Sequence, residues 1–376
     1  MDSDSSRIWS AARPLIGTMI GVGILGLPYA ILQVGIGIGI LELFLAALIS
    51  YLVLRLYGDL VMIRGGKARF IQVIGRELGH LGTGIAAFAY IGAAFGALLA
   101  YIIFGGQFLR VVTFSMLPMT TTAASVLFFT VASIFTVGGA LFVARTQKIL
   151  IPLFIGLIVL LMIVAAPHMT TAHVLASTSG DFSIPLGVMF FAFHGISAVP
   201  EMRDILGRRS NLLPKSIARA TIVVALVYAV FCIGILAVTG SATTENAILG
   251  LSTIGKSLVL LASGIALLTT FNAYTNVATQ LTNTFLYDLR MRFLSAWFLT
   301  TTIPFVLFLA GAQRISSVLS ITGGVLGSLT AIMMLIAYER ARVSADLPKN
   351  SLQISQWAIG LTFVVFIGVM VTTVIG

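Results

Sequence analysis

Residues 17–28 read GTMIGVGILGLP, so three glycines fall within seven residues of an otherwise apolar run. Each glycine weakens a helix by about 1 kcal/mol relative to alanine, and Pro28 follows them. Inside a bilayer, a helix opens only where its freed backbone lines a cavity or is covered by protein. The stretch therefore predicts a membrane helix that is interrupted at a site built from backbone groups.

A second stretch, FAFHGISAVP at residues 191–200, predicts another interruption upstream of Pro200. In the span count given below it lies five spans after the first, so the two helices cross the membrane in opposite directions. Breaks at matching positions are the expected sign of a five-plus-five inverted repeat. Close helix packing is the alternative for the first break alone, because Gly17 and Gly21 have small-residue spacing. The glycines of residues 323–327 have no matching partner, and we interpret them as packing residues.

The composition restricts the class of protein. Of the 376 residues, 59% are hydrophobic and only 9% are charged, and the mean hydropathy is +1.08, whereas soluble domains are about 45–50% apolar and about 25% charged. These values exclude a soluble enzyme, a disordered chain and a coiled coil, and the continuous apolar runs exclude a β-barrel. The net charge of +10 does not indicate nucleic-acid binding, because the basic residues fall in short loops between apolar runs. We expect an all-α polytopic membrane protein.

Apolar runs of about 20 residues mark the membrane spans of a single transmembrane domain, residues 1–376. We count eleven spans, near residues 12–32, 35–62, 82–110, 121–144, 148–166, 183–206, 216–239, 249–287, 293–311, 315–338 and 354–375. With the N-terminus in the cytoplasm, 19 of the 22 Lys and Arg residues fall at or near the inner face of the cell membrane, as the positive-inside rule requires. The C-terminus then lies outside the cell. The inverted repeats are predicted at about 12–166 and 183–338, the extra helix at about 354–375, and an amphipathic segment on the membrane surface at Phe70–Leu78.

The first stretch closely resembles the first helix of the amino acid/auxin permease and aromatic amino acid permease families, which both belong to the amino acid–polyamine–organocation superfamily. The Phe-x-Phe-His-Gly-x-x-x-x-Pro pattern of residues 191–200 resembles their sixth helix, and eleven spans also fit these families. The resemblance covers essentially the whole chain. It implies a leucine-transporter-like fold and secondary active transport of an amino acid by alternating access.

The resemblance also implies how the substrate is held. Backbone amides at the first break would bind its carboxylate, as helix N-termini bind anions, and carbonyls at both breaks would bind its ammonium group. The amides are those near Gly21, Val22 and Gly23. The carbonyls are those near Met19, Phe191 and Phe193. Phe191 would also act as an aromatic lid on the outer side, and the carboxylate would have backbone contacts alone, because many relatives have a hydroxyl residue where Val22 stands.

Two residues lie in the second interruption itself. Gly195 marks the break, and His194 beside it is a candidate proton carrier because histidine titrates near neutral pH. The alternative for His194 is a neutral imidazole that holds loose backbone in place.

The coupling ion is predicted from the same resemblance. In sodium-coupled members an ion lies between carbonyls of helix 1 and hydroxyls of helix 8; the matching residues are Gly17, Ile20, Thr269 and Thr270. In some proton-coupled relatives a lysine at the start of helix 5 takes that position, and Lys148 in the run KILIPLFI falls on it. Desolvation lowers the pKa of a lysine by up to several units, so its proton becomes exchangeable near neutrality, although Lys148 is alternatively an ordinary inner-face charge. We expect proton coupling, with sodium coupling as the alternative, and no cofactor and no metal site.

Other polar residues inside the spans are suspected of function by default. Glu42 and Lys256 lie in the outer parts of the second and eighth spans. The alternatives for them are an ion pair, proton transfer, or interfacial charges that reach water. A polar patch on the eighth span lines the pathway or bonds another helix; it consists of Asn272, Thr275 and Asn276. Cys232 lies in an apolar run and is interpreted as a buried hydrophobe.

Other function classes make different demands on the sequence. A channel would show rings of carbonyls or like charges in a symmetric oligomer, and no repeated element of that kind occurs. A non-transporting amino-acid sensor on the same fold stays an alternative, although only about ten polar residues precede the first span. An intramembrane enzyme is not expected, because His-Glu-x-x-His and Gly-x-Ser-x-Gly motifs are absent.

Overall fold

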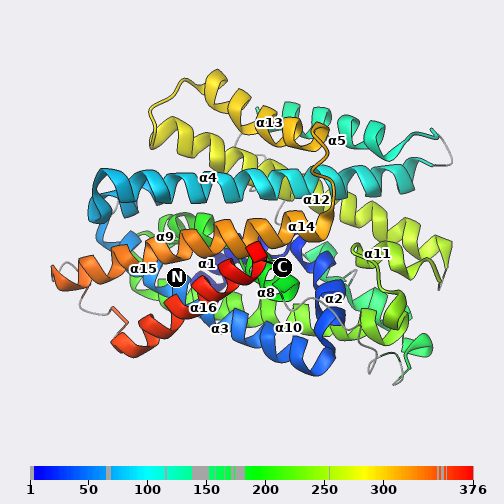
Figure 1. Ribbon diagram of the computed structural model, residues 1–376, viewed down its shortest axis with the longest axis horizontal. Helices are drawn as coiled ribbons and strands as arrows, with labels where there is room; N and C mark the ends of the chain where they lie inside the picture. Colours follow the sequence, from blue (N-terminus) through cyan, green and yellow to red (C-terminus); the bar gives the residue numbers. More distant parts are fainter. Residues whose placement is uncertain are drawn as a thin grey trace.

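The computed structural model describes most of the chain, and every element in the described part is helical. The described residues are 4–64, 69–114, 117–137, 152–156, 158–164, 166–170, 173, 183–253, 255–344, 347–348, 351–352 and 354–375. The helices form one bundle, and its long members run side by side along the longest axis of the molecule (Figure 1).

The helices vary from one turn to 44 residues. In chain order they are α1 (Asp4–Met19), α2 (Gly23–Val34), α3 (Ile36–Arg64), α4 (Phe70–Thr113), α5 (Thr121–Thr136), α8 (Ser183–Ala192), α9 (Val199–Leu206), α10 (Leu213–Thr239), α11 (Ala247–Gly250), α12 (Lys256–Tyr287), α13 (Phe293–Leu309), α14 (Ile315–Ser320), α15 (Ser328–Val343) and α16 (Gln356–Ile375). Short 3₁₀ turns are η1 (Ala166–His168), η2 (Ile196–Ala198), η3 (Gly207–Leu212), η4 (Gly240–Ala242) and η5 (Leu251–Thr253). A π-helical turn, η6 (Ile321–Gly327), joins α14 to α15.

The helices fall on the predicted spans. In the described part, six helical segments are long and apolar enough to cross a membrane, and the bent pair α1 and α2 makes a seventh candidate. One of the six, Pro185–Ala242, contains both the predicted sixth and seventh spans, and the fourth and ninth correspond to the shorter helices α5 and α13. The fifth span is described in part, within Pro152–Val164. Lys148 lies outside the described residues.

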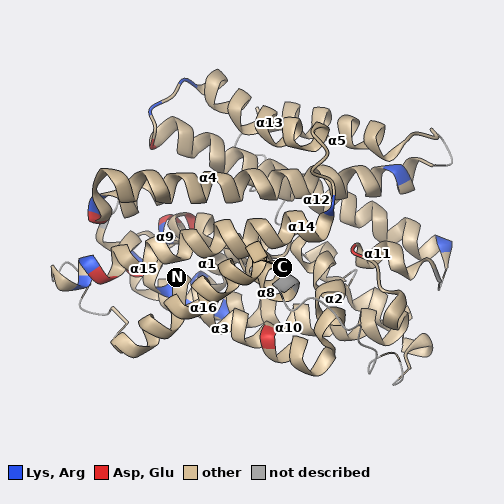
Figure 2. Ribbon diagram, in the orientation of Figure 1, with Lys and Arg blue, Asp and Glu red and all other residues tan. Residues whose placement is uncertain are grey.

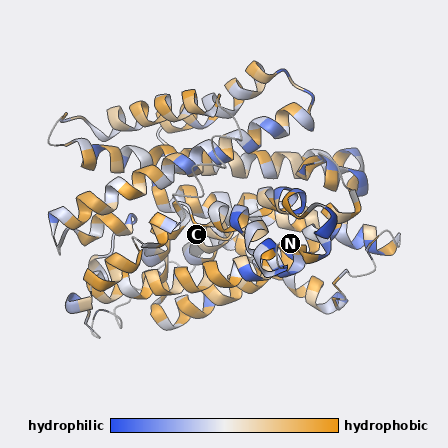
Figure 3. Ribbon diagram, turned by 180° about the vertical axis from the view of Figure 1, so that it is seen from behind, coloured by the Kyte–Doolittle hydropathy of each residue, from blue (hydrophilic) through white to orange (hydrophobic). Residues whose placement is uncertain are grey.

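The surface of the bundle suits a bilayer. Most charged residues gather at the two ends of the bundle (Figure 2), and apolar residues predominate along its length (Figure 3). Large apolar side chains on the outer helices are exposed, for example Leu294 on α13 at 74% and Val364 on α16 at 66%. Contiguous apolar surface of this kind is rare on soluble monomers and marks contact with a membrane or a partner. The chain is therefore a multi-pass membrane protein, as its composition predicted.

Both predicted interruptions are present. α1 ends at Met19, α2 begins at Gly23, and the two helices are bent by 61°. In the second broken helix, α8 ends at Ala192, and η2 and α9 follow Gly195. Pro200 lies in the first turn of α9, where its missing N–H leaves no helical hydrogen bond unmade.

Glycines at the two breaks allow the broken helices to touch. A Cβ atom on Gly23 would lie 2.8 Å from the Cα atom of Ala192. A Cβ atom on Gly195 would overlap the Cδ1 atom of Leu15 on α1. These glycines therefore serve close approach between the two breaks, in addition to weakening the helix as the sequence predicted.

The later glycines pack, as predicted. A Cβ atom on Gly323 would overlap the carbonyl oxygen of Gly187 and the amide nitrogen of Phe191, and one on Gly324 would overlap the side chain of Thr373. The π-helical turn η6 is thereby held directly against α8, next to the second break.

The segment Phe70–Leu78 forms the first turns of α4. A kink at Gly79, with a φ of 66°, separates it from the span that follows; glycine adopts this left-handed conformation without a steric cost. Phe70 and Ile74 are buried, so the apolar face of the segment packs on the protein. Its position on the membrane surface stays a prediction.

Candidate functional site

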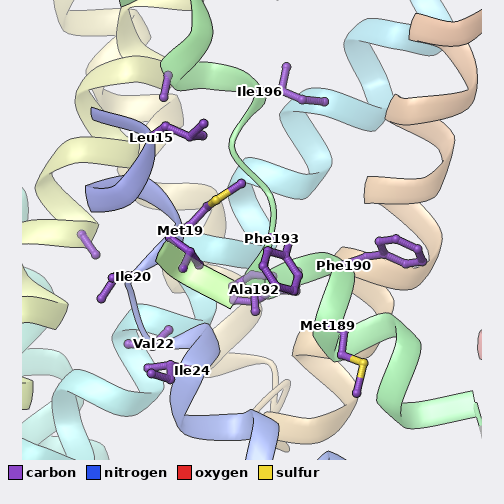
Figure 4. Packing of buried hydrophobic residues seen from close by; sticks show 14 of the residues in the cluster. Leu15, Met19, Ile20, Val22, Ile24, Met189, Phe190, Ala192, Phe193 and Ile196 are labelled. Atoms are coloured by element: carbon purple, nitrogen blue, oxygen red, sulfur yellow. The ribbon is translucent and has the colours of Figure 1, made fainter. Parts of the chain in front are cut away.

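The two breaks face each other in the middle of the bundle. Figure 4 shows the non-helical residues after Met19 opposite the loop that runs from Phe193 to Ile196, with the side chain of Met19 directed at that loop. Phe190 points away from this gap, and its ring lies 4.9 Å from the ring of Phe366 on α16. Phe190 is therefore a packing residue.

A small cavity, with about 50 Å³ open to the centre of a water molecule, adjoins both breaks. Its wall combines backbone from the breaks with side chains from α4, α12 and η6. The polar side chains that these helices contribute are Tyr90, Tyr101, Gln280 and Thr322. The arrangement brings peptide groups and a few hydrogen-bonding side chains around one partly open cavity, as in small-molecule sites generally.

The structure brings most of the predicted substrate residues to this cavity. Five of them line it, namely Met19, Gly21, Gly23, Phe191 and His194. Val22 is buried at the break without lining the cavity. Phe193 and Gly195 line a second, smaller cavity on the other side of the loop, and His194 borders both cavities.

The first break exposes the positive end of α2. Val22 is the N-cap residue of α2, and its side chain makes no capping hydrogen bond. The first turn of α2 contains no acidic residue, so its N–H groups have no carboxylate of their own helix to neutralise them. A helix N-terminus in this condition attracts an anion such as a carboxylate.

The carbonyl groups at the breaks are partly engaged. The carbonyl oxygen of Met19 accepts a hydrogen bond from the Gly21 N–H at 2.8 Å and another from the Tyr228 hydroxyl. The same hydroxyl donates to the carbonyl oxygen of Ala192 at 3.0 Å. A carbonyl oxygen has two lone pairs, so the Met19 carbonyl that the sequence analysis assigns to the ammonium is already fully used. The carbonyls of Phe191 and Phe193 stay predictions for that role.

Several residues of this region escaped the sequence analysis, among them two tyrosines and a glutamine. Tyr228 on α10 and Tyr101 on α4 are tyrosines in long apolar runs, where nothing in the local pattern distinguishes them from core residues. Gln280 on α12 follows the predicted polar patch by one helical turn from Asn276, and its amide donates to the Asn276 side chain at 3.1 Å. That spacing is the signal that could have extended the patch to Gln280.

The cavity wall carries no acid, lysine or arginine among the described residues. His194 contributes the one imidazole to that wall, and in the described part of the chain no hydrogen bond joins its imidazole to the backbone. A bound molecule with a charged side chain would lose hydration in this space without gaining an opposite charge from the wall. Burying such an unpaired charge costs free energy. The wall therefore favours a molecule whose own charges cancel.

The predicted sodium ligands lie on α1, at the first break and on α12, and their role stays a prediction. Gly21 at the first break approaches α12 at Ala273, where an added Cβ would lie 3.8 Å from the Ala273 Cβ atom. Thr270 is buried and Thr269 half-buried, and their hydroxyls donate to carbonyls of their own helix. Gly17 lies in α1, and Ile20 lies in the break that follows it.

The other suspected polar residues have separate surroundings. The three residues of the polar patch on α12 are buried. One carboxylate oxygen of Glu42 is buried without a hydrogen-bond partner in the described structure, whereas Lys256 is exposed at the first residue of α12. Cys232 is buried and free, as the apolar run around it indicated.

An aromatic stack connects the cavity to a charged end of the bundle. The ring of Tyr90, which lines the cavity, stacks on the ring of Phe70 at 4.8 Å. Beside Phe70, the carboxylate of Asp288 accepts a hydrogen bond from the Ile71 N–H at 3.2 Å. Burial raises the pKa of Asp288 to about 6, against the lowering effect of nearby backbone N–H groups and Arg69.

One motif match has no structural support. Residues 250–257 read GLSTIGKS, which fits the Gly-x-x-x-x-Gly-Lys-Ser spacing of a phosphate-binding loop and was missed in the sequence analysis. That loop functions where a strand precedes it. Here the short helix α11 leads into the motif and the 3₁₀ turn η5 lies within it, so we assign no nucleotide site to it.

Comparison of the sequence with known families gives a match over nearly the whole chain. The family described as "Transmembrane amino acid transporter protein" matches residues 4–376. A zebrafish (Danio rerio) protein named "Putative sodium-coupled neutral amino acid transporter 11" is 31% identical over 107 residues. That match covers 27% of this chain and 23% of the zebrafish protein, so it spans less than a quarter of that relative's length.

Comparison of the structure gives the fold. MhsT in complex with L-phenylalanine superposes with a TM-score of 0.67 at 13% identity, covering 98% of this chain and 97% of MhsT. The nucleobase-cation-symport-1 family transporter Mhp1, in a closed conformation with bromovinylhydantoin bound, superposes with a TM-score of 0.66 at 15% identity. The superposition covers 98% of this chain and 89% of Mhp1. A manganese transporter from Eremococcus coleocola superposes with a TM-score of 0.68 at 11% identity, covering 99% of this chain and 86% of the manganese transporter. The chain has the leucine-transporter-like fold that these proteins share, as the two breaks predicted.

Proposed function

We propose that this chain, which belongs to the transmembrane amino acid transporter family, carries a neutral amino acid across the cell membrane by alternating access. The family and the fold make it a secondary transporter and not an enzyme. The observation that carries the proposal is a cavity between two broken helices whose described wall residues include no charged side chain. A neutral amino acid is a zwitterion, so its two charges need separate, opposite partners while its net charge is zero.

The half-helix ends supply those partners. In the proposed binding mode, the N–H groups of Val22 and Gly23 at the start of α2 hold the carboxylate beside Gly21, whose own N–H already donates to the Met19 carbonyl. Carbonyl oxygens at the end of α8, near Phe191 and Phe193, hold the ammonium group. The side chain of the substrate then extends toward Tyr90 and Gln280.

The coupling ion is proposed to be a proton. Lys148 falls where proton-coupled relatives by resemblance have a lysine, and His194 borders two cavities at the second break. Sodium is the second candidate, because the zebrafish relative is named as sodium-coupled and Thr270 is buried on the helix that meets the first break.

The orientation and the repeat boundaries follow the sequence predictions. The distribution of Lys and Arg supports a cytoplasmic N-terminus and an extracellular C-terminus. The proposed inverted repeats cover about 12–166 and 183–338, each with one broken helix at its start, and α16 is the extra helix.

Uptake of radiolabelled neutral amino acids into proteoliposomes tests the proposal. We expect saturable uptake that an inward proton gradient drives in sodium-free buffer and that preloaded unlabelled amino acid accelerates by exchange. If a sodium gradient alone drives uptake, the coupling ion is sodium and not the proton. Binding to the purified protein without any flux or exchange would instead make the chain a sensor and refute transport.

A further inference from the structure

Two half-helices end against one tyrosine hydroxyl. α1 ends at Met19 and α8 ends at Ala192, and the carbonyl oxygens of these two terminal residues both accept a hydrogen bond from Tyr228. Met19 and Ala192 are 209 and 36 residues away from Tyr228 in the sequence. A tyrosine hydroxyl has a single hydrogen, so the two carbonyls converge on one point and share it.

The convergence concentrates negative charge. The C-terminal end of a helix carries roughly half an elementary negative charge on its unpaired carbonyl groups. Two such ends that meet in a water-poor interior repel each other, and the repulsion is strong because the local dielectric constant is low. A positive group between the two ends removes the repulsion, and half-helix C-terminal ends of transporters meet this need with bound cations.

Tyr228 is positioned on a continuous helix beside the two breaks. It lies within the unbroken 27-residue helix α10 and is fully buried. Its ring is tilted against the ring of Phe193 with a centroid separation of 5.1 Å. This packing holds the ring, and therefore the hydroxyl, in one position. The cavity wall beside it contains no lysine or arginine among the described residues.

We propose that the Tyr228 hydroxyl takes the place of a bound cation between the ends of α1 and α8. The O–H dipole holds the two carbonyls together and sets the geometry of both breaks, so the chain needs no ion at this point. Tyr228 is thus a positioning residue, and it acts on a substrate through the two breaks. The role does not depend on which ion drives transport.

Removing the hydroxyl exposes the site that it fills. Tyr228→Phe leaves two converging carbonyls and a space of one oxygen atom, which is a minimal site for a small cation. In thermal unfolding of the purified protein, this variant should melt below the wild type in choline chloride. Sodium or lithium chloride at about 0.15 M should raise its Tm by about 3 °C more than they raise that of the wild type, which corresponds to salt at roughly tenfold above the Kd of the new site.

A matched variant separates this effect from loss of any buried hydroxyl. Tyr338 is also buried, and its hydroxyl donates to the Leu352 carbonyl at 3.1 Å, in the loop before α16. Tyr338→Phe should lower the Tm while leaving the sodium response equal to that of the wild type. If Tyr228→Phe shows the same sodium response as the wild type and Tyr338→Phe, the proposal is wrong.

A second replacement keeps the hydrogen-bond donor. Para-aminophenylalanine at position 228 has N–H donors in place of the hydroxyl, and it should restore the wild-type sodium response. If Tyr228→Phe does not fold, the sodium dependence of the Tm of this variant still tests the proposal. An enlarged sodium response despite the retained donor, or failure of this near-isosteric variant to fold, would overturn the proposal.

Discussion

Replacement of Gly21 by leucine perturbs the first break at the point where the substrate carboxylate is proposed to bind. Gly21 lines the cavity, and a Cβ atom added to it would lie 3.5 Å from the Tyr101 hydroxyl oxygen and 3.8 Å from the Ala273 Cβ atom. Those are ordinary van der Waals distances, so the backbone accepts the first carbon. The further carbons of leucine have to occupy the space between the break and Tyr101, where the proposed carboxylate lies.

The size of the effect follows from the contacts that the leucine displaces. A hydrogen bond to a charged group contributes about 1.5–3 kcal/mol, and two backbone N–H groups are proposed to hold the carboxylate. Losing both raises the Kd by about two to four orders of magnitude, at 1.4 kcal/mol for each factor of ten. Gly21→Ala adds only the tolerated Cβ atom and should change the Kd by less than about tenfold.

Equilibrium binding of a radiolabelled neutral amino acid to the purified variants measures this difference. Gly264 on α12 is the matched control, because a Cβ atom there meets no atom within 4 Å and the residue does not line the cavity. Gly264→Leu should bind like the wild type. Wild-type affinity in a folded Gly21→Leu protein would refute the placement of the carboxylate at the first break.

Three further predictions address coupling, pH and packing. Lys148→Ala should reduce uptake driven by a pH gradient more than counter-flow exchange; equal reduction of the two would argue against proton coupling through Lys148. The raised pKa of Asp288, about 6 against an ordinary 3.8, means that the folded state binds the proton more tightly than the unfolded state, so stability falls as pH rises between these values. Asp288→Asn should flatten the dependence of Tm on pH in that window, and an unchanged slope would contradict the assignment. Gly323→Ala forces a Cβ atom onto the backbone of Gly187 and Phe191 and should cost about 1–3 kcal/mol or more, seen as a Tm lower by at least about 2 °C; Gly264→Ala should not lower the Tm.

The membrane spans and the two breaks were predictable because they rest on local properties of the chain. Span length is set by bilayer thickness, which requires long apolar runs whatever the tertiary structure. Glycine and proline, which weaken a continuous helix, mark the breaks in the sequence. The structure interrupts the helices there, at residues 20–22 and 193–195. The same local signal located five of the eight predicted substrate residues at the cavity.

The remaining parts of the site depend on contacts between distant segments. Tyr228 acts on Met19 across 209 positions, and Tyr101 faces Gly21 from another long helix. A tyrosine in an apolar membrane helix has the same local pattern whether its hydroxyl faces a break or a neighbouring helix. The sequence therefore could not show that the Met19 carbonyl is already engaged, and it assigned that carbonyl to the substrate.

The demand for a zwitterion is the central claim, and competition for uptake tests it most directly. Uptake of a radiolabelled neutral amino acid into proteoliposomes is measured against the same amino acid unlabelled, its decarboxylated amine and its deaminated acid. If the two half-helix ends hold both charges in a cavity whose described wall carries no charged side chain, the intact amino acid competes best. Each singly charged analogue is weaker by at least about a hundredfold, since each lacks the hydrogen bonds to one charged group. Competition by the amine or the acid equal to that of the amino acid would contradict the account.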